Sequence, residues 1–300
     1  MTGDVIRLEK DGLIVKVSPL GGSILSAEWH GIPFLQPAPS PGLASKVLGA
    51  EACFPLVPFG NRIENNSFRF NGRDYTLAPN TADPLVLHGD GWLQRWTVEQ
   101  HTPHRIVLRV SKDADLASPF AYEATETITP GNGQLTIALA VVNRATETLP
   151  YGLGFHPYFP RTPETHLFAR AHRHWSEREN HLPGAVGPIP PGLNFAAGTT
   201  LPHHWLNNAF DGWDGQARIE WPETGLALSL TADTLFDRFV VYSPSPHAGF
   251  FCFEPMSHQP NGHHLRRNGG LAALAPGRAV SGQLTLSLRS LSRRSTRERS

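Results

Sequence analysis

Apolar and polar residues alternate with a period of two along most of the chain, and this pattern restricts the fold more than any other feature. In the segment from Leu13 to Ser18, for example, Leu13, Val15 and Val17 fall on one side of an extended chain. Segments of the same character occupy residues 68–70, 73–77, 96–100, 105–110, 122–129, 135–142, 217–221, 225–231, 238–242, 249–253 and 283–288. Successive side chains of a strand point to opposite faces, so each segment is predicted to be a short β-strand.

Turns rich in Gly and Pro separate these segments. Asn71-Gly72 lies between two of them and predicts a type I′ hairpin, and residues 130–133, which read Pro-Gly-Asn-Gly, predict a second turn. The 28 glycines and 27 prolines among 300 residues fit many turns. No segment reads as a helix longer than about two turns. Many short strands between such turns predict an all-β sandwich or barrel.

No linker divides the chain into two units. Residues 182–198 are rich in Pro and Gly, but strand-like segments lie on both sides, which favours a long surface loop within one domain. We therefore expect a single domain over residues 1–288. Residues 289–300 carry five arginines against one glutamate and predict a disordered basic tail, with nucleic-acid or membrane binding by this tail as the weaker alternative.

Charge and composition exclude several classes of protein. Lys and Arg together number 26, as do Asp and Glu, so the chain lacks the basic excess of a nucleic-acid binder. No apolar run approaches the roughly 18 residues of a membrane helix. The charged residues among the first twelve argue against a secretory signal. Cys53 and Cys252 are too few for a disulfide scaffold or a thiolate zinc site, so we expect a cytoplasmic protein.

Two segments present polar side chains on loops. In the first, Phe54 to Ile63, two prolines precede Asn61 and Arg62, whose guanidinium suits sugar hydroxyls or a carboxylate; a surface pair with Glu64 is the alternative. In the second, residues 87–92, His88 stands among glycines that let a ligand approach the backbone closely. A turn with an exposed histidine and a buried tryptophan is the alternative there.

Two further segments place an ionisable side chain among aromatic residues. His156 lies in Gly-Phe-His-Pro-Tyr-Phe, where apolar neighbours would keep a neutral imidazole partly dry. The alternative is a hydrogen-bonded histidine of the core. Glu254 ends the run Phe-Phe-Cys-Phe, and a carboxylate there either points outward or is held dry for a purpose. In a strand, Phe250, Cys252 and Glu254 would share one face.

In this order, the four segments resemble the aldose 1-epimerase, or galactose mutarotase, family. The similarity lies in Asn61-Arg62-Ile63, Leu87-His88-Gly89, Gly154 to Phe159 and Phe253-Glu254-Pro255, and it extends over roughly residues 10–288. The resemblance implies a β-supersandwich, with a sugar cleft on one face of a single domain. It also implies an isomerase that interconverts the α and β anomers of an unphosphorylated aldose, as a monomer or a homodimer.

The resemblance also implies a role for each residue. Glu254 would be the base that removes the O1 proton, and His156 the acid that protonates the ring oxygen O5. Arg62, His88 and Asn61 would bind and orient the sugar. Only protons move, so no cofactor is expected, and neither the cysteines nor the histidines form a recognisable metal motif.

One position departs from the family pattern. Where the family often carries an Asp in Asp-Asn-x-Phe-x-Gly-Trp, this chain has Asn207. We expect Asn207 to contact the sugar less strongly than a carboxylate, with Asp211 as a substitute, and Asn207→Asp to lower the KM for glucose.

Three other activities compete with this one. The first is a hexose-6-phosphate epimerase, with Arg95, Arg266 and Arg267 as phosphate ligands. The second is a non-catalytic sugar-binding protein on the same scaffold. The third is a glycosidase, which the lack of a second well-placed carboxylate disfavours.

Overall fold

The computed structural model describes residues 5–36 and 51–291. Within these ranges the secondary structure consists of strands and short 3-10 helices, which confirms the predicted all-β class. The longest of these helices, η6 (Arg266–Gly270), has five residues. No helix in the described ranges is long and apolar enough to cross a membrane.

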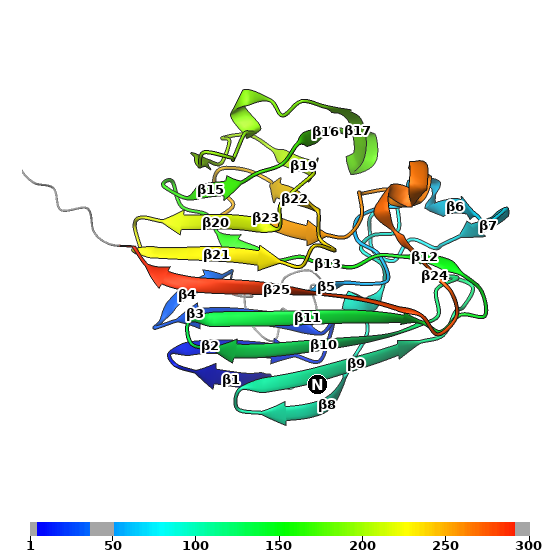
Figure 1. Ribbon diagram of the computed structural model, residues 1–300, viewed down its shortest axis with the longest axis horizontal. Helices are drawn as coiled ribbons and strands as arrows, with labels where there is room; N and C mark the ends of the chain where they lie inside the picture. Colours follow the sequence, from blue (N-terminus) through cyan, green and yellow to red (C-terminus); the bar gives the residue numbers. More distant parts are fainter. Residues whose placement is uncertain (1–4, 37–50, 292–300) are drawn as a thin grey trace, which may run out of the picture.

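The largest sheet has nine antiparallel strands and fills the front of the molecule in Figure 1. Their order is β18-β15-β20-β21-β25-β11-β10-β9-β8. The strands are β8 (Thr97–Thr102), β9 (Arg105–Lys112), β10 (Tyr122–Gly131), β11 (Gln134–Asn143), β15 (His166–Ala169), β18 (Thr199–Thr200), β20 (Gln216–Trp221), β21 (Leu226–Ala232) and β25 (Ala279–Ser290).

The second large sheet has eight strands, and Glu254 lies on one of them. Seven of them follow the order β17-β16-β19-β22-β23-β13-β5, and β14 pairs with β23 beside this path. The strands are β5 (Pro55–Leu56), β13 (Gly154–Phe155), β14 (Tyr158–Pro160), β16 (Arg173–Arg178), β17 (Leu182–Gly187), β19 (Leu206–Asp211), β22 (Arg238–Ser243) and β23 (Phe250–Met256).

Smaller sheets and 3-10 helices complete the fold. A four-stranded sheet contains β1 (Ile6–Lys10), β2 (Leu13–Ser18), β3 (Ser23–Trp29) and β4 (Ile32–Leu35). Two pairs are β6 (Ser67–Phe70) with β7 (Arg73–Thr76), and β12 (Leu149–Tyr151) with β24 (Ala272–Leu274). The other helices are η1 (Glu64–Asn66), η2 (Gly91–Leu93), η3 (Glu179–His181), η4 (Pro191–Leu193) and η5 (Gly262–His264).

The sheets form layers around one extended hydrophobic core. β1 and β2 lie against β10, so the four-stranded sheet covers part of the nine-stranded one. Leu228 and Leu286 from the nine-stranded sheet join the same buried cluster as Phe251 and Phe253 of β23. Because side chains alternate along a strand, Cys252 and Glu254 belong to the opposite face of β23, as the sequence predicted.

Most of the predicted strands are confirmed, and one of the two predicted turns differs in detail. Asn71 and Gly72 both have positive φ between β6 and β7, as a type I′ turn requires. The second predicted turn is shorter than expected. β10 and β11 extend until Gly131 pairs with Gln134, which leaves two residues between the strands.

One boundary prediction was wrong. Residues 182–198 are not all loop, because β17 (Leu182–Gly187) forms an edge of the eight-stranded sheet. An edge strand tolerates Pro183, since an outward-facing position needs no backbone donor. β25 continues through Ser290, past the predicted end of the domain. Residues 292–300 of the predicted tail lie outside the described residues.

Two loops that frame the site are joined at Gly89. Gly89 forms a parallel bridge with Val57, and its φ of +62° lies in the left-handed region. A Cβ atom at this position would collide with the backbone carbonyl oxygen of Val57. Only glycine fits this contact, because any other residue adds both strain and overlap.

We predict that Gly89→Ala lowers the free energy of unfolding by about 2 kcal/mol more than Gly72→Ala does. Gly72 also has positive φ, at +80°, but a Cβ atom there meets nothing within 4 Å. The control therefore shares the conformational strain and lacks the collision. Urea denaturation followed by tryptophan fluorescence measures both changes. Equal losses for the two variants would contradict the steric account.

Candidate active site

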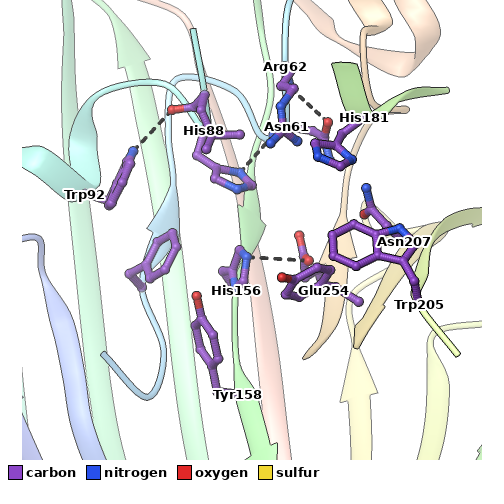
Figure 2. Close-up of a pocket in the computed structure, with 13 residues that line it drawn as sticks. Asn61, Arg62, His88, Trp92, His156, Tyr158, His181, Trp205, Asn207 and Glu254 are labelled. Carbon is purple, nitrogen blue, oxygen red and sulfur yellow. Dashed lines mark hydrogen bonds and ion pairs between the residues drawn. The ribbon is translucent and has the colours of Figure 1, made fainter. Parts of the chain in front are cut away.

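A cavity of about 320 Å³ opens on the face of the eight-stranded sheet that carries Glu254. Its volume is that of a small-molecule site. Six of the seven predicted site residues line it, and Figure 2 shows them converging from separate loops and strands. These residues are Asn61, Arg62, His88, His156, Asn207 and Glu254.

Strand register brings His156 and Glu254 together. β13 and β14 both pair with β23, through Gly154 with Met256 and through Tyr158 with Cys252. The same register, continued across the gap between β13 and β14, places His156 opposite Glu254. Their closest atoms, His156 Nε2 and Glu254 Oε1, are 3.5 Å apart. The two side chains are only 8% and 3% exposed, so the pair is almost completely dry.

Burial changes the proton affinity of both groups in the direction that favours neutral forms. It raises the pKa of Glu254 to about 8, and the positive charge of Arg62 opposes this rise. It lowers the pKa of His156 to about 3. Glu254 Oε2 and His156 Nδ1 are buried without a hydrogen-bond partner among the described residues. The carboxyl group therefore keeps one oxygen free of protein donors.

His88 is fixed by the backbone of the neighbouring loop. Its Nδ1 accepts a hydrogen bond from the Asn61 amide at 3.0 Å, and its own amide donates to the Asn61 carbonyl at 2.9 Å. Burial lowers the pKa of His88 well below its usual value. The ring is therefore neutral, with its hydrogen on Nε2. Both residues have φ near +60°, a region that Asn and His tolerate better than most residues.

Arg62 does not pair with Glu64, the alternative that the sequence allowed. Arg62 Nε and Nη2 donate to Asp83 Oδ2 at 2.9 and 2.7 Å, whereas Glu64 bonds to Arg178 at 2.7 Å. The Arg62 side chain is 14% exposed and lines the cavity. Asp83 thus holds the guanidinium in one orientation. Without this partner, the flexible arginine side chain could adopt several orientations.

Asn207 and Asp211 have separate environments. Asn207 lines the cavity, whereas Asp211 does not. Asp211 is 5% exposed, and its carboxylate accepts hydrogen bonds from Arg173 and Trp175 at 2.9 to 3.1 Å. The two residues share a face of β19, but they are four positions apart, which is about 13 Å along the strand. Asp211 therefore does not substitute for Asn207 in the cavity.

Aromatic and imidazole side chains that the sequence did not assign to the site complete the cavity wall. They are Phe54, Trp92, Tyr158, His181, Trp205 and Tyr242. The ring centroid of His156 lies 4.6 Å from that of Phe54 and 4.8 Å from that of Tyr158, and both pairs are stacked. Phe54, Trp92 and Tyr158 belong to segments that the sequence singled out. Trp205 and His181 carried no such signal.

Among the residues that the structure describes, no group of three or more His, Cys, Asp or Glu side chains is placed to hold a metal ion. Cys252 is fully buried in β23 and does not line the cavity. The chemical groups at the centre of the cavity are therefore the carboxyl of Glu254 and the imidazoles of His156 and His88.

Two relatives from Escherichia coli K12 are similar in sequence. The uncharacterized protein YphB is 37% identical over 297 residues, which cover 94% of this chain and 98% of YphB. The uncharacterized protein YihR is 27% identical over 218 residues, which cover 69% of this chain and 70% of YihR.

Solved structures confirm the predicted galactose-mutarotase-like fold. An Escherichia coli K12 protein, provisionally described as an aldose 1-epimerase, matches with a TM-score of 0.90 at 37% identity over 96% of this chain and 99% of its own. A galactose mutarotase-like protein from Clostridium acetobutylicum matches with a TM-score of 0.83 at 18% identity, over 96% of each chain. A family model described as aldose 1-epimerase matches residues 4–287. The chain therefore belongs to the aldose 1-epimerase family.

Proposed function

We propose that this protein interconverts the α and β anomers of an unphosphorylated aldose of the glucose or galactose type. One observation carries the proposal: a buried carboxyl and a buried imidazole lie 3.5 Å apart in a cavity of sugar size. Membership of the family supports the reaction class. The identity of the sugar, the cytoplasmic location and the oligomeric state are predictions from the sequence.

The reaction needs a base and an acid that act on two oxygens of the same carbon. Glu254 accepts the proton of the O1 hydroxyl, and the bond between C1 and the ring oxygen O5 breaks as His156 gives O5 a proton. The open aldehyde rotates about the C1–C2 bond. The two residues then exchange roles, and the ring closes on the other face of C1. No proton is gained or lost over the cycle.

The two pKa values mean that the pair holds a single exchangeable proton at neutral pH. Between about pH 3 and about pH 8, one group can give a proton and the other can accept one. In the empty cavity this proton resides on Glu254. When a sugar hydroxyl donates to the carboxyl, it stabilises the ionised form, and His156 takes the proton across the short contact.

The surrounding residues hold the sugar and stabilise charge on its oxygens. His88 offers its Nε2 hydrogen, because Nδ1 is engaged by the Asn61 amide. Arg62 offers Nη1, because Asp83 occupies its other two nitrogens. Asn61 acts by shaping the loop. Phe54 and Trp92, stacked with centroids 5.2 Å apart, provide an apolar wall for the C–H face of the ring.

The charges around the cavity favour an unphosphorylated sugar. Arg62 is the one arginine among the described lining residues, which include no lysine, and Asp83 already neutralises it. Arg95, Arg266 and Arg267, the phosphate ligands considered from the sequence, do not line the cavity. These observations argue against the hexose-6-phosphate alternative. A non-catalytic binding protein would have no need for a dry acid–base pair.

We predict that Glu254→Gln and His156→Ala each reduce kcat/KM about 10²- to 10⁴-fold, because each removes one of the two proton-transfer groups. Polarimetry of freshly dissolved α-D-glucose and α-D-galactose measures the rate. The double variant should lose little more than either single variant, since the two groups act as a unit. A folded single variant with the wild-type rate would exclude this mechanism, and an inactive wild-type protein would favour the binding-protein alternative.

The pH dependence of kcat/KM should be bell-shaped. Above about pH 8 Glu254 loses the shared proton and no acid remains, so activity falls. Below about pH 3 His156 also becomes protonated and no base remains. Initial rates across this range, corrected for spontaneous mutarotation, give both limbs. Activity that continues to rise from pH 7 to pH 10 would indicate a simple carboxylate base and contradict the shared-proton account.

A further inference from the structure

We propose that Glu177, a carboxylate outside the cavity, is the positioning residue that makes this cavity select a neutral sugar. This inference rests on the proposed function and identifies the part of the wall that determines specificity. Glu177 lies on β16 and does not line the cavity. It acts through three residues that do.

All three side chains donate hydrogen bonds to the carboxylate of Glu177. Asn207 Nδ2 lies 2.7 Å from Oε1, Trp205 Nε1 lies 2.6 Å from Oε2, and His181 Nδ1 lies 2.5 Å from Oε1. Figure 2 shows the three donor residues side by side on the wall to the right of Glu254. Charge-assisted bonds of this kind are shorter and stronger than neutral ones. The carboxylate of Glu177 thus fixes the positions of Asn207, Trp205 and His181, which together form this wall of the cavity.

The contact determines which atom Asn207 offers to a ligand. A carboxylate only accepts hydrogen bonds, so the amide nitrogen of Asn207 must face Glu177. The carbonyl oxygen, Oδ1, therefore faces away from Glu177, and it is the atom that Asn207 can offer to the cavity that it lines. Asn207 therefore presents an acceptor to a sugar hydroxyl, as the Asp of the family pattern would. The acceptor is oriented by Glu177 and carries no charge of its own.

This arrangement reverses the expectation for Asn207→Asp. An aspartate at position 207 would place a second carboxylate at hydrogen-bond distance from Glu177, where the two charges repel each other. The substitution should therefore weaken sugar binding. The contact with Glu177 was invisible in the sequence, because 30 residues separate the two positions.

The backbone of β16 explains how Glu177 reaches this position. The register with β17 shifts between Trp175 and Glu177, and such a bulge redirects the side chain that follows it. The next residue, Arg178, turns to Glu64 at 2.7 Å and does not neutralise Glu177. His181 offsets this charge only when its imidazole is protonated, so beside a neutral His181 the wall keeps a negative charge behind it. A phosphorylated sugar would meet this charge, whereas a neutral sugar would meet only the oriented acceptor.

The first test is Glu177→Gln, assayed by polarimetry with glucose and galactose. Glutamine offers one acceptor oxygen and turns an NH₂ group toward the donors, so Asn207 is released. We expect KM to rise about five- to tenfold, with kcat within about twofold of wild type and both limbs of the pH profile unchanged. Glu179→Gln is the matched control. It removes the same charge two residues away, from an exposed side chain, and should leave KM unchanged.

A double variant separates positioning from a general structural effect. In the Asn207→Ala background, Glu177→Gln should raise KM by less than about twofold, because the sugar-facing acceptor that Glu177 orients is absent. The inference would be overturned if Glu177→Gln raised KM equally in both backgrounds. It would also be overturned if Glu177→Gln left KM unchanged or lowered kcat alone. If Glu177→Gln fails to fold, Trp205→Phe removes a single donor bond and should give a smaller rise in KM. An unchanged KM for that variant would also count against the proposal.

The charge is tested with a phosphorylated sugar. Wild type should prefer glucose over glucose 6-phosphate, and Glu177→Gln should reduce that preference about fivefold or more. A wild-type protein that prefers the phosphorylated sugar would overturn the inference while leaving epimerase activity intact. A wild-type protein inactive on every aldose would instead overturn the proposed function. Calorimetric titration of glucose into wild type and Glu177→Gln then still tests the wall, because it measures binding without turnover.

Discussion

The exclusion of water from the Glu254 carboxyl is the physical condition on which the site depends. A carboxylate taken out of water without a partner is costly, and one oxygen of Glu254 has no protein donor in the described structure. The residue therefore holds a proton at neutral pH, which in the proposed mechanism it exchanges with the sugar. An exposed carboxylate would remain ionised and serve only as a weak base. Dryness thus turns an ordinary acidic side chain into a reversible proton carrier.

The sheet provides this dryness and sets the distance between acid and base. On one face of β23, Phe251 and Phe253 belong to the hydrophobic core, while Glu254 faces the cavity on the other. The register of β13 and β14 against this strand then brings His156 opposite Glu254. Neither group depends on a flexible loop for its position. The residues proposed to bind the sugar, by contrast, come largely from loops, which are free to vary between relatives.

Much of the fold and the chemical centre of the site could be predicted from the sequence, because both follow from local patterns. Alternating segments gave most strands, and His156 and Glu254 lie in short motifs. The rest depended on contacts between distant segments. Asp83, which orients Arg62, is 21 residues away from it. β17 was missed because its Pro and Gly residues suit an edge strand, a position that only the sheet order reveals. Asp211 lies on the same face of β19 as Asn207, but it is too far along the strand to line the cavity.

Two glutamates near the cavity show how environment assigns different tasks to the same side chain. Glu177 engages both of its oxygens with donors from the protein, so it orients its neighbours and is not available to a substrate proton. Glu254 keeps one oxygen without a hydrogen-bond donor from the protein. In the proposed reaction, a sugar hydroxyl is the donor to this carboxyl group and exchanges a proton with it. Adding a donor beside Glu254 would therefore stabilise the fold and weaken the base. Removing donors from Glu177 would instead loosen the wall and leave the acid–base pair intact. In the proposed mechanism, binding and chemistry are thus controlled by separate carboxylates, which lets the specificity of the cavity change without altering the proton transfer.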